Sequence, residues 1–432
     1  MARNEKKALH WVRLDNAAKI YPAARRRNWS SIYRQSMTLR DEVDVTILRS
    51  ALDVTIKRFP SIAARLRRGV FWYYLEQIES APEICEEKSC PLVFMNNKEI
   101  RKCAFRVIVY RNRIAIELFH ALTDGTGAMI FLKTLVAEYL EQKYGISIPN
   151  EDGILDRHEK PTEDELEDSF LKYAGKVAAS RKSTNAWHLS NGSASDVFLN
   201  LTCFLLPVKE TIELAHKHGT TLTVFLSAVM MKALINLQKE KVPFEHKRER
   251  IKLMIPINLR KLFPSKTLRN FAMYTIPELD PRLGEYTFDE ICKIIYHKMG
   301  AEFTAKYMST VIATNVKSER NTLIRLIPLP LKNLVMKAIF NSVGEIKSCL
   351  ALSNLGVVKM PDIMRQYVER MDFIVGVRAS APYNCGVVSF GDTIYVNFIR
   401  SIPEPELERH FFAVLHEMGL PVTVESNRNF EV

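Results

Sequence analysis

A short segment between a predicted strand and a predicted helix constrains this chain more than any other part of it. Apolar side chains occupy alternate positions over residues 113–119, which predicts a strand with one apolar face. His120 continues the positions of that face, so we expect its imidazole to point into the interior. After Gly125 the apolar residues recur at helical spacing, which predicts a helix over residues 127–144. The segment therefore places one histidine at a strand end, beside a turn in which glycine gives the backbone more conformational freedom.

The residue types in this turn suit acid–base chemistry. An apolar environment favours the neutral form of histidine, which can then accept a proton as a general base. A carboxylate, Asp124, follows His120 four residues later. Two other interpretations stay open on these residues alone: His120 as a hydrogen-bonded core residue, and Asp124 as an ordinary turn residue. A metal site is not expected, because no other histidine supplies a third ligand at a matching spacing.

Size and composition are those of an ordinary globular protein. The chain has 432 residues, 47% hydrophobic and 25% charged, which is enough for two or three domains. Charges interrupt its apolar runs well short of a membrane span, so no integral membrane segment is expected. The charged N-terminus has no apolar signal region, which predicts a cytoplasmic protein. Seven cysteines at irregular spacing argue against a disulfide framework.

The formal net charge of +12 comes partly from four basic clusters. These are residues 25–27, 65–68, 247–250 and 260–261. Each cluster is consistent with solvated surface, and together they also suit a phosphorylated partner such as a cofactor or an acidic carrier protein. Nucleic acid is not expected as a partner, because the sequence has no aromatic and basic stacking pattern and no recognised binding motif.

Strands and helices are mixed in both halves of the chain, which indicates an α/β protein of two lobes. We expect an N-terminal lobe over residues 1–180, a polar crossover linker over 181–195 and a C-terminal lobe over 196–432. Further helices are predicted at 45–59, 208–217, 224–237 and 404–418. Further strands are predicted near 70–75, 103–110, 197–206, 251–257, 349–355, 372–377 and 393–398, with a hairpin turn at Gly391-Asp392.

The run from His120 to Gly125 resembles the HxxxDG signature of the chloramphenicol acetyltransferase-like superfamily, which includes condensation domains and acyl-CoA:alcohol acyltransferases. Other segments resemble the family in the same order along the chain. They are Pro60 with residues 64–68, residues 256–260 followed by 269–271, and residues 352–356. The chain has Phe119 where many members have a second histidine, which is compatible with the single-histidine O-acyltransferases and similar to alcohol acetyltransferase-like proteins.

This resemblance implies two lobes in a V around a central tunnel, with the HxxxD loop at their junction. It implies transfer of an acyl group, acetyl or another short acyl, from a coenzyme A thioester to a hydroxyl, with His120 as the general base. Asp124 would pair with an arginine, for which Arg260 is the candidate and Arg65 the competitor. The other residues that it implies near the site are Gly125, which would allow close approach of the pantetheine arm, and the polar candidates Asn270, Ser353 and Asn354.

The expected partners are a small-molecule alcohol and acyl-CoA as a co-substrate, with no permanently bound cofactor. Two other functions remain open: a condensation-type enzyme that uses acyl groups on a phosphopantetheinyl carrier protein, and a catalytically silent binding protein of the same fold. One segment, residues 323–340, is apolar and contains Lys332 and Lys337. Such a run is most often core or tunnel lining, and the alternative is contact with a membrane surface, with the lysines toward anionic headgroups.

Overall fold

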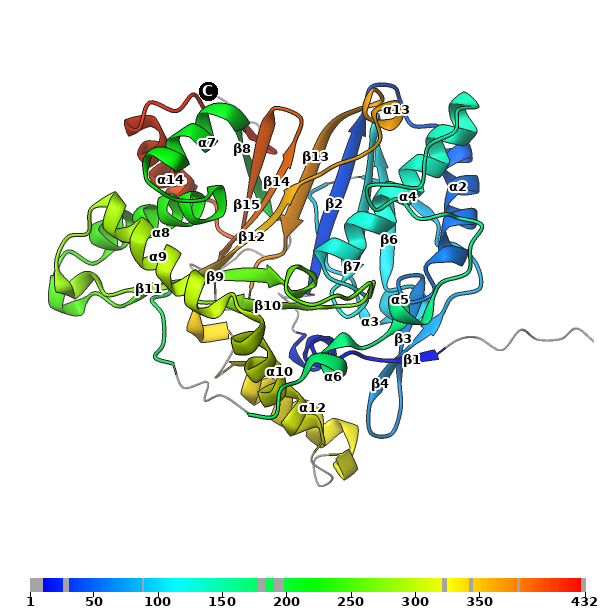
Figure 1. The fold of residues 1–432 in the computed structure, drawn as a ribbon, viewed down its shortest axis with the longest axis horizontal. Coiled ribbons are helices and arrows are strands. Elements are labelled where there is room, and N and C mark those ends of the chain that lie inside the picture. The colour runs from blue at the N-terminus through cyan, green and yellow to red at the C-terminus, as the bar shows by residue number, and fades with distance from the viewer. Residues whose placement is uncertain are drawn as a thin grey trace, which may run out of the picture.

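The computed structural model describes residues 11–25, 31–87, 89–177, 183–189, 198–320, 325–341, 345–378 and 381–428. Their strands form three sheets, and helices pack on them (Figure 1). The α/β class expected from the sequence is confirmed. Within the predicted linker, residues 181–182 and 190–195 lie outside the described residues, as do Arg26 and Arg27 of the first basic cluster.

The first half of the chain contributes most of a five-stranded sheet. Its order is β13 (Val368–Val375), β2 (Ile32–Leu39), β7 (Arg113–Phe119), β6 (Phe105–Tyr110) and β5 (Ile84–Glu86). Only the β5–β6 pair is parallel among these strands. Helix α4 (Gly125–Tyr144) packs against β2 and β7, and α2 (Val45–Arg58) packs against α4 (Figure 1).

Strand β7 lies between β2 and β6, so both of its edges are paired. The sequence predicted one apolar face, but Ala115, Glu117 and Phe119 on the other face are buried as well. Glu117 tolerates burial because Arg34 of β2 donates to its carboxylate at 2.7 Å. The strand that leads to His120 is therefore a fixed central element.

The second half forms an eight-stranded sheet. Its order is β10 (Ala272–Thr275), β9 (Ile251–Asn258), β12 (Leu350–Val357), β14 (Tyr383–Phe390), β15 (Thr393–Arg400), β8 (Asn200–Pro207) and β16 (Thr423–Ser426), and β11 (Glu278–Leu279) also pairs with β9. The β14–β15 hairpin turns at Gly391 as expected. The helices of this half are α7 (Val208–Lys217), α8 (Leu222–Lys241), α9 (Phe288–Glu302) and α14 (Glu406–Glu417).

Smaller elements surround these two sheets. The third sheet has the order β1 (Trp11–Arg13), β4 (Tyr73–Gln77) and β3 (Ala64–Arg68). The other α-helices are α1 (Ile20–Ala24), α3 (Asn97–Lys102), α5 (Glu163–Leu166), α6 (Ser169–Tyr173), α10 (Ala305–Arg320), α12 (Leu329–Ile339) and α13 (Asp362–Arg365). The 3₁₀ turns are η1 (Glu245–Lys247), η2 (Leu259–Lys261), η3 (Pro281–Leu283) and η5 (Glu345–Lys347).

One strand crosses between the halves. Strand β13 comes late in the chain, yet it pairs with β2 in the sheet of the first half (Figure 1). Residues 196–432 therefore do not form a self-contained unit. The division into lobes at 181–195 and their arrangement as a V stay predictions.

Helix α8 corrects one expectation. Within the described part of the chain it is the one helix long and apolar enough to cross a membrane, although the sequence was expected to contain no such run. Of its most apolar window, 72% is buried inside the protein, where α8 packs against α14, α9 and β9. Its composition is therefore explained by its place in the core of the second half.

Candidate active site

The loop after β7 is fixed by the start of helix α4. Asp124 is the N-cap of this helix, and its Oδ1 accepts from the backbone N–H groups of Thr126 and Gly127, each at 3.1 Å. An aspartate at this position satisfies N–H groups that have no partner within the helix. This is why α4 begins at Gly125, two residues earlier than its apolar pattern predicts.

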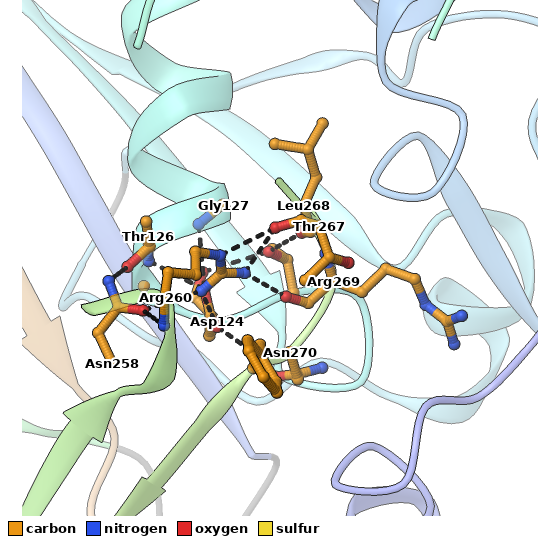
Figure 2. Close-up of polar contacts among 12 residues, drawn as sticks. Asp124, Thr126, Gly127, Asn258, Arg260, Thr267, Leu268, Arg269 and Asn270 are labelled. Atoms are coloured by element: carbon orange, nitrogen blue, oxygen red, sulfur yellow. Dashed lines mark hydrogen bonds and ion pairs between the residues drawn. The ribbon is translucent and has the colours of Figure 1, made fainter. Parts of the chain in front are cut away.

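The other oxygen of Asp124 reaches the second half of the chain. Its Oδ2 accepts from Nη1 of Arg260 at 2.7 Å and from the backbone N–H of Phe271 at 2.8 Å (Figure 2). Both carboxylate oxygens of this buried residue thus have two donors each. Such a carboxylate holds structure together and has no lone pair directed at a substrate.

The guanidinium of Arg260 also donates to backbone oxygens of its own segment. Its Nε and Nη2 donate to the backbone oxygen of Thr267 at 2.9 and 2.8 Å, and Nη2 donates to that of Arg269 at 2.6 Å (Figure 2). The competing candidate Arg65 lies elsewhere, on β3, where its Nε donates to Glu76 at 2.6 Å. Of the two arginines considered from the sequence, the structure pairs Arg260 with Asp124.

His120 is bonded through one ring nitrogen. Its Nδ1 lies 3.1 Å from Oδ1 of Asn270, and the Nδ2 group of Asn270 donates to Oδ2 of Asp15 at 3.2 Å. Asp15 also accepts from two backbone N–H groups, those of Ala18 and Asn270. Because the NH₂ group of Asn270 donates to Asp15, the amide oxygen of Asn270 faces His120. Nδ1 is then the donor of the imidazole, and Nε2 carries its lone pair.

Two tyrosines enclose the imidazole. The ring of Tyr21 stacks on it with centroids 4.4 Å apart, and the ring of Tyr33 lies at 5.0 Å in a tilted arrangement. Burial lowers the pKa of His120 from its usual 6.5, against a hydrogen bond with its own backbone, the charges of Asp124 and Asp15, and the bond to Asn270. The residue nevertheless stays partly exposed to solvent. Its neutral form is therefore favoured in a place that solvent reaches.

The two glycines of the loop serve close packing. A Cβ on Gly127 would come within 2.1 Å of Oγ1 of Thr123 and 2.4 Å of the backbone oxygen of Leu268. A Cβ on Gly125 would come within 2.6 Å of a terminal methyl group of Leu355, on strand β12. Gly125 thus makes room for a side chain of the second half, whereas its expected role toward a pantetheine arm stays a prediction.

The remaining candidates lie in two places. Asn270 lies beside His120, and its amide is hydrogen-bonded to Asp15 and to the imidazole. Asn270 is therefore placed to orient the imidazole. Asn354 of β12 donates to Oγ1 of Thr223 at 3.0 Å and accepts from the backbone of Gly356 at 2.8 Å. Ser353 is partly exposed on the same strand. Neither Ser353 nor Asn354 has a described contact with His120.

Three residues of the site were missed from the sequence: Asp15, Tyr21 and Tyr33. Tyr33 also anchors the loop, since its hydroxyl donates to the backbone oxygens of Thr123 and Asp124, both at 3.0 Å. All three precede the motif by some ninety residues or more, so no local spacing could connect them with it. Among the described residues, no group of three or more histidine, cysteine, aspartate or glutamate side chains is placed to hold a metal ion.

Comparison with known proteins gave no matching family model and no matching curated protein. Solved structures do match over nearly the whole chain. TRI101 of F. graminearum, complexed with coenzyme A and deoxynivalenol, has 12% identity and a TM-score of 0.63, covering 96% of this chain and 99% of its own. TRI3 trichothecene 15-O-acetyltransferase of Fusarium sporotrichioides has 13% identity and a TM-score of 0.60, covering 94% of this chain and 94% of its own.

The first condensation domain of the CDA synthetase has 10% identity and a TM-score of 0.56, covering 95% of this chain and 96% of its own. Identities this low establish a shared fold and leave the reaction open. The structures that match include acetyltransferases and condensation domains. The chain shares the α/β fold of these two acetyltransferases and of this condensation domain.

Proposed function

We propose that this protein is an acyltransferase that moves an acyl group from a coenzyme A thioester to a hydroxyl acceptor. One observation carries the proposal: His120 is bonded through Nδ1 to Asn270, which leaves Nε2 as a proton acceptor on a residue that is partly exposed. A structural core histidine would have its second nitrogen paired as well. No described hydrogen bond engages Nε2 of His120.

In the proposed reaction Nε2 removes the proton of the acceptor hydroxyl while the oxygen attacks the thioester carbonyl. The tetrahedral intermediate then collapses, the carbon–sulfur bond breaks, and the imidazolium returns the proton to the departing thiolate. A lowered pKa suits this role, because the base must be neutral when the acceptor arrives. Asp124 stays outside the proton path, since both of its oxygens have structural donors.

Direct transfer without an acyl-enzyme is part of the proposal, since no cysteine or serine lies in a recognisable nucleophile motif. Burial raises the pKa of Cys103 and Cys292 to about 12 and that of Cys349 to about 11, which disfavours the thiolate at neutral pH. Ser353 is the remaining polar candidate for stabilising the oxyanion of the tetrahedral intermediate. The amides of the other two candidates, Asn270 and Asn354, have hydrogen-bond partners elsewhere.

Two observations favour coenzyme A as the carrier of the donated acyl group. TRI101, which has the same fold, was solved in complex with coenzyme A. The net charge of +12 also suits a phosphorylated donor. Condensation domains share the fold too, so a carrier-bound acyl group is the second candidate donor.

A panel of donors and acceptors tests the proposal. Purified protein is mixed with acetyl-CoA, longer acyl-CoAs or an acyl group on a carrier protein, each with alcohols or amines, and free thiol is measured. We expect acceptor-dependent thiol release from at least one acyl-CoA with an alcohol. Release from the carrier-bound donor alone would favour the condensation reaction, and no release from any pair would favour a silent binding protein.

A further inference from the structure

Helix α12 presents its more apolar face to solvent. Leu331 is 57% exposed, Leu334 66% and Val335 51%, and Ala338 on the same stripe is exposed as well. The buried face of the same helix contains Leu329, but also Lys332 at 2% exposure. Positions 331, 334, 335 and 338 follow the spacing by which an amphipathic helix buries one side. Here that side faces outward.

Polar contacts fix the helix in this orientation. Nζ of Lys332 donates to the backbone oxygen of Phe71 at 2.9 Å and lies 3.4 Å from the ring centroid of Trp72. Nδ2 of Asn333 donates to the hydroxyl of Tyr73 at 3.0 Å. Both partners lie at the β3–β4 hairpin, so α12 cannot rotate its apolar stripe inward without breaking these contacts. Lys332 thus points into the protein, whereas the membrane alternative considered from the sequence had it face headgroups.

The hairpin extends the apolar area. The backbone N–H of Leu329 donates to the backbone oxygen of Val70 at 3.0 Å, which sets the hairpin turn beside the start of α12 (Figure 1). At that turn Val70 is 72% exposed and Phe71 41% exposed, and Leu326 just before the helix is 63% exposed. The α12 surface is defined here as Val70, Phe71, Leu326, Leu331, Leu334 and Val335. Exposed apolar patches of this kind mark interaction sites on protein surfaces.

The charged residues of α12 and of the segment that leads into it are all positive. From Arg325 to Asn341 the sequence contains no aspartate or glutamate. Arg325, Lys337 and, at the hairpin, Arg68 are exposed. A second copy of the chain would bring the same positive charges against these, which disfavours self-association. A partner that offers hydrocarbon and negative charge together satisfies both features.

We propose that the α12 surface docks on anionic lipid, with Leu331, Leu334 and Val335 among the acyl chains and Arg325 and Lys337 at the headgroups. The helix lies in the plane of the interface and does not cross it, since it has 11 residues. Docking of this kind is independent of the proposed acyl transfer. It holds whether or not His120 acts as a base.

Vesicle co-sedimentation tests this proposal. The full-length protein is mixed with vesicles of phosphatidylcholine alone or with about one third phosphatidylglycerol, at low and high salt. Binding to the anionic vesicles is expected, and salt should weaken it. Leu334→Asp should reduce the partition coefficient about tenfold, because it removes apolar area and adds a negative charge. The matched control is Leu283→Asp in η3, a leucine that is 80% exposed away from this surface.

Three results would overturn the proposal. The first is equal binding by Leu334→Asp and Leu283→Asp, and the second is no binding to either vesicle. The third is a concentration-dependent dimer, seen by light scattering, that Leu334→Asp abolishes without vesicle binding by the parent. Thiol release with water-soluble substrates, measured on the same preparations, should be equal in both variants and so reports on the proposed reaction separately.

Discussion

Nη1 of Arg260 donates to Oδ2 of Asp124 at 2.7 Å and joins two segments that lie 136 residues apart in the chain. The aspartate caps the helix that follows the HxxxD loop, and the arginine holds the loop between η2 and β10 through two backbone oxygens. The pair therefore fixes the loop of His120 against the second half. Asn270, the partner of the imidazole, lies in the same tied segment (Figure 2).

Removing this carboxylate should cost stability as well as activity. In Asp124→Ala, Arg260 loses its ion pair in a place where its side chain is only 12% exposed, and α4 loses its cap. We expect the free energy of unfolding to fall by about 3 kcal/mol or more. Urea denaturation measures it. As a control, Arg65→Ala breaks a more exposed pair and should cost about 1 kcal/mol or less. A variant Asp124→Ala that is as stable as the parent yet inactive would mean that Asp124 takes part in the chemistry.

The two glycines of the loop should differ in their tolerance of a methyl group. In Gly127→Ala the new Cβ meets a backbone oxygen and a fixed hydroxyl, so we expect a loss of about 1–3 kcal/mol and a lower melting temperature. In Gly125→Ala it meets the end of the Leu355 side chain, which can move aside. The smaller loss should therefore belong to Gly125→Ala. The reverse order in thermal melts would contradict the packing described here.

The pH dependence of activity should report on the environment of the imidazole. Because burial lowers the pKa of His120, the base stays neutral down to a pH below 6.5, and kcat/KM should fall only below that value. Asn270→Ala would remove the bond to Nδ1, which raises the pKa of His120, so the pKa should fall further. Its acid limb should therefore move to lower pH than that of the parent. An acid limb at the same pH in both proteins would rule out the Asn270 contact as a determinant.

Local patterns predicted the elements that carry the motif. The bounds of β7 and α7 are those that the periodicity indicated, and α2 and α4 differ by one and two residues. Strand β2 was missed, although it is central in the sheet, because Arg34, Gln35 and Ser36 make it read as polar. These side chains are buried, and Arg34 has Glu117 and Glu87 as ion-pair partners. A pairing between distant strands has no trace in local periodicity.

The same limit applies to the site. The motif supplied His120 and Asp124, and the downstream resemblance supplied Arg260 and Asn270, which the fold brings together. Asp15 and Tyr21 could not be found, because each acts across a distance in the chain that only the folded structure closes. Ser353 keeps the role proposed for it, whereas the bonds of Asn354 give that residue a structural part.

The most direct test of the account is the turnover of His120→Ala in acceptor-dependent thiol release, compared with the parent and with His216→Ala, which removes an exposed histidine on α7. We expect kcat to fall about 10²–10⁴-fold in His120→Ala and to stay near the parent value in His216→Ala, with both variants folded by circular dichroism. If His120→Ala turns over as fast as the parent with the same substrates, the imidazole is not the base and the proposed mechanism is wrong.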